Sequence, residues 1–370
     1  MAISNPLCMV NEFGQSLWLD DLRRDLITSG ELKRLIEEDC VRGLTSNPTI
    51  FQKAIMGSAS YDDQIRLLNE QHKSVDEVYE SLVIDDIRHA ADLFRPLYDA
   101  TQGADGYVSI EVSPRLAYDT EGTVTEAIRF WKTIDRPNIM IKIPATLQGV
   151  PAVERVIAEG INVNVTLIFS LERYQAVTRA YIEGLGALAA KGGDVSKVAS
   201  VASFFVSRVD AAVDKLLEAK QTDVSALFGK AAIANAALAY KIWEGIFGGE
   251  AFVSLKARDA KPQRLLWAST GTKNPSYRDV LYVEELIGAQ TVDTLPPATL
   301  TAFKDHGVAR PTLEAKVGEA QAILDQLHLV GIDMVAVTQK LEDEGVKSFA
   351  ASFEDLMTAL AAKQKVVATV

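Results

Sequence analysis

The sequence has few of the residues that build disulfide frameworks and metal sites. It contains two cysteines in 370 residues, Cys8 and Cys40, which are far apart and lack the spacing of a metal-binding pair. We therefore expect two free thiols on small buried side chains in a reducing compartment, not a disulfide. The four histidines lie in helix-like or turn-like contexts, and we assign none of them a catalytic role.

Positive charge and long apolar runs are also scarce. The chain has 38 Lys and Arg against 50 Asp and Glu, a formal net charge of −12, which argues against general binding to nucleic acid or anionic membranes. No stretch approaches the roughly 18 apolar residues of a membrane-spanning helix, and the first residues do not resemble a signal peptide. We expect a cytoplasmic protein whose anionic ligands, if any, bind in a local cationic pocket.

Short apolar stretches alternate with longer stretches of helical periodicity, which is typical of β/α units around a parallel sheet. Stretches such as 75–100 and 170–193 read as helices, the second with Ser170 as its N-cap. A G-x-G-x-x-G turn after the first strand and a Walker loop are both missing, which weakens a nucleotide-binding interpretation. The candidate strands are 16–20, 43–47, 106–113, 138–144, 161–169, 198–205, 264–270 and 291–296. Eight such strands predict an α/β fold of the (β/α)8 TIM barrel type.

The last part of the chain follows another pattern. Residues 311–327 and 346–364 are predicted as amphipathic helices on either side of a short helix. No linker, repeat or low-complexity tract divides the chain. We expect residues 1–310 to form the barrel domain and residues 311–370 to form a C-terminal helical extension packed on it.

Charged and polar residues interrupt one face of several predicted strands. Side chains alternate between the two faces of a strand, and this rule places Asp20, Glu111, Lys142, Asn164 and Thr166 inside the barrel, near the strand ends where this fold assembles active sites. Lys142 could snorkel, pair with Glu111 or Asp20, or serve as a neutral amine for chemistry. A paired polar core explains each residue alone about as well as a site does. A buried ionic cluster, however, gives little stability for its desolvation cost, which favours a functional site.

Several blocks of the sequence resemble, in order and spacing, the blocks of the transaldolase family. They are GLTSNPTIF (43–51), VSIEVSPRLAYD (108–119), IMIKIPATLQG (139–149), GINVNVTLIFS (160–170) and ASFFVSR (202–208). The length is similar to the longer bacterial form. The resemblance implies an enzyme of the pentose phosphate pathway that needs no metal or other cofactor. It would move a dihydroxyacetone unit from sedoheptulose 7-phosphate or fructose 6-phosphate to glyceraldehyde 3-phosphate or erythrose 4-phosphate.

The resemblance also implies catalytic roles. Lys142 matches the lysine that forms a Schiff base with the ketose, and an amine held out of water is favoured in its neutral, nucleophilic form. Asp20 matches the general acid/base that takes the C4 hydroxyl proton during cleavage, and the adjacent Asp21 is the second choice. Glu111 and Thr166 match the groups that, with a water, move protons as the carbinolamine loses or gains water.

Substrate-binding roles carry over one position at a time. Asn47 and Asn164 match amides that hold the hydroxyls of the dihydroxyacetone unit, although Asn47 also suits a helix cap or turn. Arg208 matches the phosphate-binding arginine, Ser203 matches a pocket hydroxyl, and Phe205 matches the aromatic residue between them.

The second phosphate-binding cation departs from the family's pattern. Compact relatives have an arginine near the loop STGTK (269–273), where this sequence has Lys273. This loop follows the seventh strand, a common place for phosphate in this fold. We expect Lys273 to replace the arginine and Ser269 to line the same pocket.

Two other functions stay open. A fructose 6-phosphate aldolase-type lyase would release free dihydroxyacetone, but such relatives are shorter and carry a tyrosine where a hydroxyl assists, so Asp20, Glu111 and Phe205 favour transfer. A non-catalytic sugar-phosphate-binding barrel would be expected to lack Lys142, Asp20 or Glu111. The expected partners are sugar phosphates, with no nucleic acid or membrane, and the chain is expected to be a monomer or a homodimer.

Overall fold

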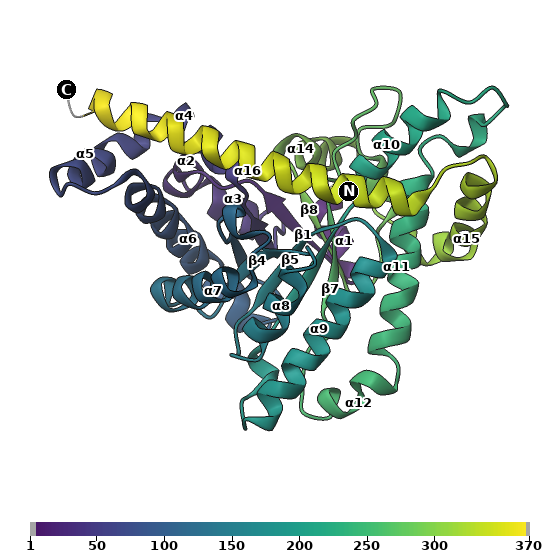
Figure 1. The fold of residues 1–370 in the computed structure, drawn as a ribbon, viewed down its shortest axis with the longest axis horizontal. Helices are drawn as coiled ribbons and strands as arrows, with labels where there is room; N and C mark the ends of the chain where they lie inside the picture. Colours follow the sequence, from purple (N-terminus) through teal and green to yellow (C-terminus); the bar gives the residue numbers. More distant parts are fainter. Residues whose placement is uncertain (1–4, 368–370) are drawn as a thin grey trace.

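A computed structural model describes residues 5–367, which form a closed barrel of eight parallel strands surrounded by helices (Figure 1). The strands follow chain order around the barrel, and the first pairs with the last. They are β1 Gln15–Asp20, β2 Gly43–Thr45, β3 Tyr107–Glu111, β4 Ile139–Pro144, β5 Val163–Ile168, β6 Ser200–Phe205, β7 Arg264–Ala268 and β8 Thr291–Leu295. Each predicted strand is present with its ends shifted by at most two residues, so the predicted (β/α)8 TIM barrel is confirmed.

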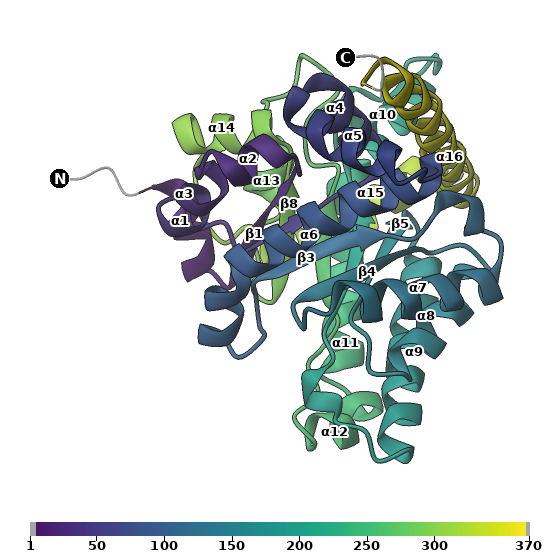
Figure 2. The same cartoon turned by 90° about the vertical axis from the view of Figure 1, so that its left-hand side faces the viewer.

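Helices surround this barrel and extend beyond it (Figure 2). The predicted helix at 75–100 is α6, and the Ser170 side chain caps α9 by accepting a hydrogen bond from the backbone N–H of Arg173. The α-helices are α1 Pro6–Glu12, α2 Arg24–Thr28, α3 Glu31–Glu37, α4 Pro48–Gly57, α5 Asp62–Glu70, α6 Val75–Ala100, α7 Thr120–Ile134, α8 Gly149–Ile157, α9 Leu171–Ala190, α10 Ser207–Leu217, α11 Ala231–Phe247, α12 Glu250–Lys256, α13 Leu281–Glu285, α14 Pro297–His306, α15 Leu313–Leu329 and α16 Met334–Val367. Short 3-10 helices occupy Ala59–Tyr61, Pro114–Leu116, Val195–Lys197 and Ser225–Leu227.

The core lies between the outer face of the barrel and the helices. On β4, Ile139, Ile141 and Ile143 are fully buried on this face, and burying one such side chain contributes about 1.5 to 3 kcal/mol. The alternate residues of β4, Met140 and Lys142, point into the barrel. A strand packed in this way is a rigid support for the side chains on its inner face.

The C-terminal segment differs from the prediction in one respect. The predicted short helix and the predicted helix at 346–364 are a single continuous helix, α16, which crosses the carboxyl ends of the strands (yellow in Figure 1). Gly345 does not interrupt α16, because it lies against β5, where an added Cβ would be 2.9 Å from Leu167 Cδ2. Close packing therefore outweighs the weak helix propensity of glycine. The preceding helix, α15, packs against α11.

No single helix in residues 5–367 has the length and apolar composition to cross a membrane; only the pair α15 and α16, bent by 94° at their junction, meets that test by length and composition.

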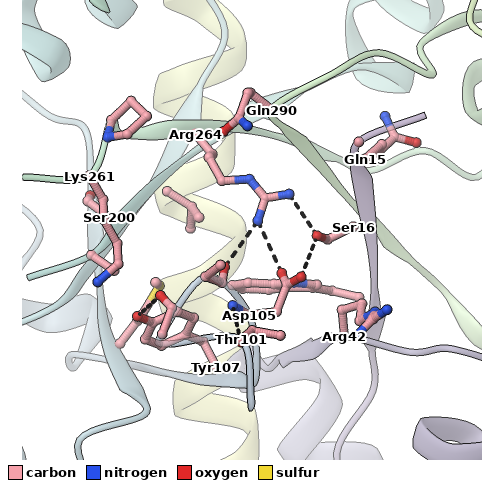
Figure 3. A pocket seen from close by; sticks show the side chains of 18 of the residues that line it. Gln15, Ser16, Arg42, Thr101, Asp105, Tyr107, Ser200, Lys261, Arg264 and Gln290 are labelled. Carbon is pink, nitrogen blue, oxygen red and sulfur yellow. Dashed lines mark hydrogen bonds and ion pairs between the residues drawn. The ribbon is translucent and has the colours of Figure 1, made fainter. Parts of the chain in front are cut away.

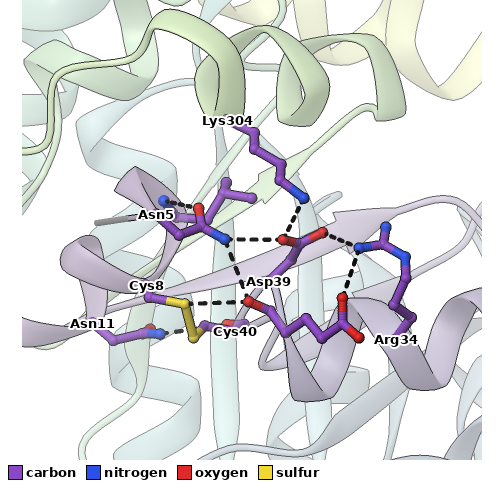
Figure 4. Close-up of a disulfide and its surroundings, with 9 residues drawn as sticks. Asn5, Cys8, Asn11, Arg34, Asp39, Cys40 and Lys304 are labelled. Carbon is purple, nitrogen blue, oxygen red and sulfur yellow. Dashed lines mark hydrogen bonds and ion pairs between the residues drawn. A yellow bond between two sulfur atoms is a disulfide. The ribbon is translucent and has the colours of Figure 1, made fainter. Parts of the chain in front are cut away.

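The expectation of two free thiols is wrong. Cys8 of α1 and Cys40, which lies between α3 and β2, form a disulfide with a Cα–Cα distance of 5.1 Å (Figure 4). The pair was not evident from the sequence because tertiary packing, not spacing, brings α1 beside this connection. The buried Asp39 strengthens the contact, since its carboxylate accepts a hydrogen bond from Asn5 at 2.9 Å and pairs with Lys304 at 2.6 Å.

Candidate active site

Strand register brings the polar inner side chains together at the carboxyl end of the barrel. Glu111 on β3 is opposite Lys142 on β4, and Lys142 is opposite Asn164 on β5. Asp20 on β1 is likewise opposite Thr45 on β2. Because all the strands are parallel, residues at one level of neighbouring strands point into the same part of the interior.

A cavity of about 180 Å³ lies at this end of the barrel. Most of the predicted site residues line it, whereas Glu111 and Asn164 lie just behind its wall. The lining consists of Asp20, Thr45, Asn47, Lys142, Thr166, Ser203, Phe205, Arg208, Ala268, Ser269, Gly271, Lys273, Thr294, Pro296 and Phe349. Residues from position 20 to position 349 are thus brought into one small volume.

The Lys142 side chain is 5% exposed, which rules out the snorkelling alternative. Its amine donates a hydrogen bond to the backbone carbonyl of Ser46 at 3.1 Å, and Nζ lies 3.7 Å from Glu111 Oε2. The contact with Glu111 is an ion pair too long for a good hydrogen bond. An ammonium group has three N–H donors, so this buried nitrogen is left with bonding capacity directed at the cavity.

Glu111 and Thr166 are under-satisfied polar groups beside Lys142. Burial, opposed by the charge of Lys142 and aided by that of Asp20, raises the pKa of Glu111 to about 7. Glu111 Oε2 and Thr166 Oγ1 are both buried without a hydrogen-bond partner among the described residues. Buried polar atoms normally have partners, so these two atoms mark a place where a substrate group or a water is expected. A carboxyl group that titrates near neutral pH can accept and return protons.

Asp20 is held in place by a hydroxyl network. Its Oδ1 accepts a hydrogen bond from Thr45 Oγ1 at 2.7 Å, and Thr45 Oγ1 is 2.7 Å from Thr294 Oγ1. Burial raises the pKa of Asp20, although the charge of Lys142 and the bond from Thr45 oppose the shift. Asp21, by contrast, forms an ion pair with Arg23 at 3.1 Å and does not line this cavity. The geometry therefore favours Asp20 of the two.

The other side of the cavity carries two cations, Arg208 and Lys273, that form no ion pair within the part of the chain that the structure describes. Arg208, in the first turn of α10, has no hydrogen bond or ion pair among residues 5–367, and its guanidinium lies 5.4 Å from the centroid of the Phe205 ring. Burial lowers the pKa of Arg208, and burial together with the nearby charge of Arg208 lowers the pKa of Lys273. Two neighbouring cations at a helix N-terminus form a site for an anion.

The two predicted amides have different positions. Asn47 lines the cavity and also caps α4, because its Oδ1 accepts a hydrogen bond from the backbone N–H of Ile50 at 3.0 Å. The helix-cap interpretation of Asn47 is confirmed, and its substrate-binding role stays a prediction. Asn164 lies below the cavity, where it donates to Ser109 Oγ at 3.0 Å and accepts from Ser203 Oγ at 2.7 Å. In this arrangement Asn164 orients Ser203.

Comparison with known proteins agrees with this geometry. The sequence model of the family described as Transaldolase/Fructose-6-phosphate aldolase matches residues 17–360. The chain belongs to this family. It is 52% identical to "Transaldolase" of Thiobacillus denitrificans over 349 residues, which are 94% of this chain and 97% of that protein. It is also 52% identical to "Transaldolase" of Saccharopolyspora erythraea (96% and 97% covered) and 49% identical to that of Trichodesmium erythraeum (98% of each). The resemblance found in the sequence blocks is thereby confirmed.

The site of this family member includes residues that the sequence did not reveal. Phe349 of α16 lines the cavity, and its ring centroid lies 5.9 Å from Lys142 Nζ. Thr45 and Thr294 connect Asp20 to β8. Thr294 follows the period-2 rule on a strand that was predicted, so its inward direction could have been foreseen. Phe349 gives no such signal, because it is one of several apolar residues on one face of an amphipathic helix.

A larger cavity, of about 500 Å³, lies at the opposite end of the barrel (Figure 3). Two of its four charged residues, Arg264 and Asp105, form an ion pair, whereas the Arg42 side chain has no hydrogen bond or ion pair among the described residues. Arg264 donates to Ser16 Oγ at 2.7 Å and forms an ion pair with Asp105 at 3.1 Å, and Ser16 also donates to Asp105 at 2.9 Å. Volume alone would select this cavity, but we assign the site to the smaller one because Lys142, Asp20 and the cations Arg208 and Lys273 lie together there.

Within residues 5–367, no group of three or more His, Cys, Asp or Glu side chains is arranged to hold a metal ion.

Proposed function

We propose that this chain is a transaldolase of the pentose phosphate pathway. It transfers a dihydroxyacetone unit from sedoheptulose 7-phosphate or fructose 6-phosphate to glyceraldehyde 3-phosphate or erythrose 4-phosphate. The observation that carries the proposal is the buried Lys142, whose Nζ lies 3.7 Å from Glu111 Oε2, in a cavity that also holds Asp20 and two cations with no ion pair among residues 5–367. A nucleophilic amine, proton-transfer groups and an anion site are what this reaction requires.

The reaction begins when the Lys142 amine attacks the C2 carbonyl of the ketose. The carbinolamine then loses water, and Glu111 and Thr166 move the protons, since both have an unpartnered oxygen beside the amine. Asp20 takes the proton of the C4 hydroxyl, which breaks the C3–C4 bond. The iminium accepts the electron pair of that bond and becomes an enamine, so Lys142 stabilises the carbanion equivalent.

The second half of the reaction reverses these steps with a new aldehyde. The enamine carbon forms a bond to the acceptor's carbonyl carbon, and Asp20 returns its proton to the resulting alkoxide. Arg208 and Lys273 bind the phosphate of donor and acceptor alike, since a guanidinium can hold two phosphate oxygens. Ser203, Ser269, Asn47 and Phe205 shape the space between the two ends, and Asn164 acts by orienting Ser203.

The test of this proposal is to trap the covalent intermediate. The protein is incubated with fructose 6-phosphate without acceptor and reduced with borohydride, and the added mass is located by peptide mass spectrometry. We expect a dihydroxyacetone-sized adduct on Lys142 that is lost in Lys142→Ala. The control Lys273→Ala should still form the adduct at a saturating donor concentration, with a raised KM. A folded protein that gives no adduct would instead be a sugar-phosphate-binding barrel.

Adding erythrose 4-phosphate then separates transferase from lyase. A transferase forms sedoheptulose 7-phosphate, whereas an aldolase-type lyase releases dihydroxyacetone at the same rate with or without acceptor. The approximately 50% identity to proteins named "Transaldolase" over nearly the full chain supports the transferase.

A cytoplasmic location and a monomeric or dimeric state stay predictions. Phosphorylated substrates support the location, and the Cys8–Cys40 disulfide stands against it, since cytosolic thiols are held reduced. Rapid alkylation of thiols during cell lysis, followed by mass spectrometry of the two cysteine peptides, tests the location. Light scattering in solution tests the oligomeric state.

A further inference from the structure

The C-terminal helix directs two aromatic rings at the barrel end. Phe349 is 7% exposed and lines the cavity with Lys142. Phe353, one turn further along the same face of α16, lines a neighbouring cavity of about 250 Å³ behind Glu111. Its ring packs edge-on against Tyr79, with centroids 5.3 Å apart. The two rings are similar in size and burial, but only Phe349 lies beside the amine.

Contacts along its length fix α16 in place. Glu342 pairs with Arg173 at 3.1 Å, with both side chains at most 13% exposed. Near the other end, Lys363 pairs with Asp62 at 2.8 Å and donates to the backbone carbonyls of Ile55 and Ser58. Between these anchors, Gly345 lets the helix approach β5 closely. The Phe349 ring is therefore held over the site.

The position of this ring matters because the enamine on Lys142 has two fates. In transfer, its electron pair forms a carbon–carbon bond to the aldehyde of the acceptor. In release, the same carbon takes a proton, water adds to C2 of the resulting iminium, and the C2–N bond breaks. Release thus consumes one water and yields dihydroxyacetone and the free Lys142 amine.

The reactive carbon of the enamine is two bonds from Nζ, and the Phe349 centroid is 5.9 Å from that nitrogen. The ring therefore occupies space from which water could protonate the carbon. Making and breaking the Schiff base needs one water, for which the unpartnered Glu111 Oε2 and Thr166 Oγ1 offer hydrogen-bond partners, and it needs no bulk water at the position of the ring. An apolar group fixed beside a reactive intermediate excludes water and suppresses hydrolysis.

We propose that Phe349 is a specificity-determining residue of this reaction: its ring keeps water from the enamine on Lys142, so that the three-carbon unit is transferred and not released. This inference rests on the proposed transaldolase function.

The test compares two rates in one sample. Dihydroxyacetone release and sedoheptulose 7-phosphate formation are both measured with fructose 6-phosphate and erythrose 4-phosphate, and their ratio is taken. The ratio does not depend on the fraction of folded protein, so a loss of stability cannot imitate the effect. We expect Phe349→Ala to raise the ratio of release to transfer about tenfold or more. Phe349→Leu keeps an apolar side chain of similar bulk and should restore a ratio near that of the unaltered protein.

Phe353→Ala is the matched control, because it removes an equally buried ring from the same face of α16, away from Lys142. It should leave the ratio within about twofold of the original value, well under the tenfold effect expected at Phe349. If Phe349→Ala does not fold, Phe349→Val also removes the ring and serves the same comparison.

The inference is overturned if Phe349→Ala transfers with an unchanged ratio. It is also overturned if Phe353→Ala raises the ratio equally, since loosening of the helix would then be the cause. Absence of the Lys142 adduct in the unaltered protein would instead remove the proposed function, and this inference with it.

Discussion

The two ends of the barrel interior are formed by the same strands but are lined by different side chains. Trp18, Met140 and Val201 line the 500 Å³ cavity at the amino ends of β1, β4 and β6. Two positions further along these strands, Asp20, Lys142 and Ser203 line the 180 Å³ cavity. A shift of two residues keeps the same face of a strand, so one inward-facing row of side chains changes from mainly apolar to polar along its length.

The two ends differ in which groups they bring together. At the larger cavity, each terminal nitrogen of Arg264 contacts two acceptors, on Ala104, Asp105, Ser16 and Thr291, while Arg264 Nε, Gln15 Oε1 and Trp18 Nε1 have no partner among the described residues. At the smaller cavity, Arg208 has no counter-ion within the described chain, and Glu111 Oε2 and Thr166 Oγ1 lack partners. Polar atoms without partners therefore occur at both ends. The end that is suited to chemistry is distinguished by a buried amine that lies with carboxyl groups and cations in one small space.

The largest expected effect comes from removing one charged residue at each end. Lys142→Met removes the nucleophile and should lower the transfer rate by at least about 10,000-fold. It should lower the free energy of unfolding by less than Arg264→Met does, because the pKa of the Glu111 left without its partner is already raised to about 7 and this carboxyl can take up a proton. Arg264→Met leaves Asp105 without its partner and should lower the free energy of unfolding by about 3 kcal/mol, while kcat of the folded protein stays within about twofold, since no group at the chemical end changes. Urea unfolding and steady-state kinetics measure both. A loss of activity at full stability in Arg264→Met would make the larger cavity part of the functional site.

The Cys8–Cys40 disulfide also tests whether contacts at the amino end of the barrel affect stability without affecting catalysis. Cys8 and Cys40 precede β1 and β2 and therefore belong to the amino end of the barrel. The bond closes a loop with a sequence separation of 32 residues, so reduction should lower the free energy of unfolding by about 3 to 4 kcal/mol on the chain-entropy account. The transfer rate should not change. The reductant should have no further effect on Cys8→Ser, and a fall in rate on reduction would show that the two ends are coupled.

The effect that is confined to a single group is a pH dependence of stability. Glu111 has a pKa of about 7 in the folded protein against an ordinary value of 4.5, so the folded state binds its proton more tightly. Its contribution to stability is therefore full below about pH 4.5 and is lost as the pH rises to about 7. Glu111→Gln should remove this loss, so its stability relative to the unaltered protein should increase across that range. Urea unfolding at pH 4.5, 6 and 7 measures the difference. An unchanged pH profile in this variant would contradict the assignment.

Asp293 on β8 gives a matched comparison. It is fully buried, neither carboxylate oxygen has a hydrogen-bond partner among the described residues, and burial raises its pKa to about 8. Asp293→Asn should flatten the pH dependence of stability in the same direction, between about pH 4 and pH 8, while activity is retained. Loss of activity in Glu111→Gln and its retention in Asp293→Asn would separate the proton-transfer role from burial alone.

The sequence predicts the barrel strands and their inward-facing polar side chains well, because both depend on short-range rules. Strand alternation places Lys142 and Glu111 inside, and the register of consecutive parallel strands then makes them neighbours. The Cys8–Cys40 pair and the contact between Phe349 and Lys142 depend on how helices far apart in the chain pack. No local pattern contains that information. The continuity of α16 through Gly345 has the same origin, since the helix packs closely on β5 at this residue.

The order in which the chain is synthesised gives α16 a further consequence. β8 ends at Leu295, so the barrel can close while Phe349 is still inside the ribosome. A nascent chain at that stage, or a chain truncated within α16 before Phe349, would contain Lys142, Arg208 and Lys273. It would lack the Phe349 ring that lines the cavity with them. The ring proposed to protect the intermediate is therefore made only after all eight strands, so a barrel that has just closed would hold the amine before it holds the group that keeps water away.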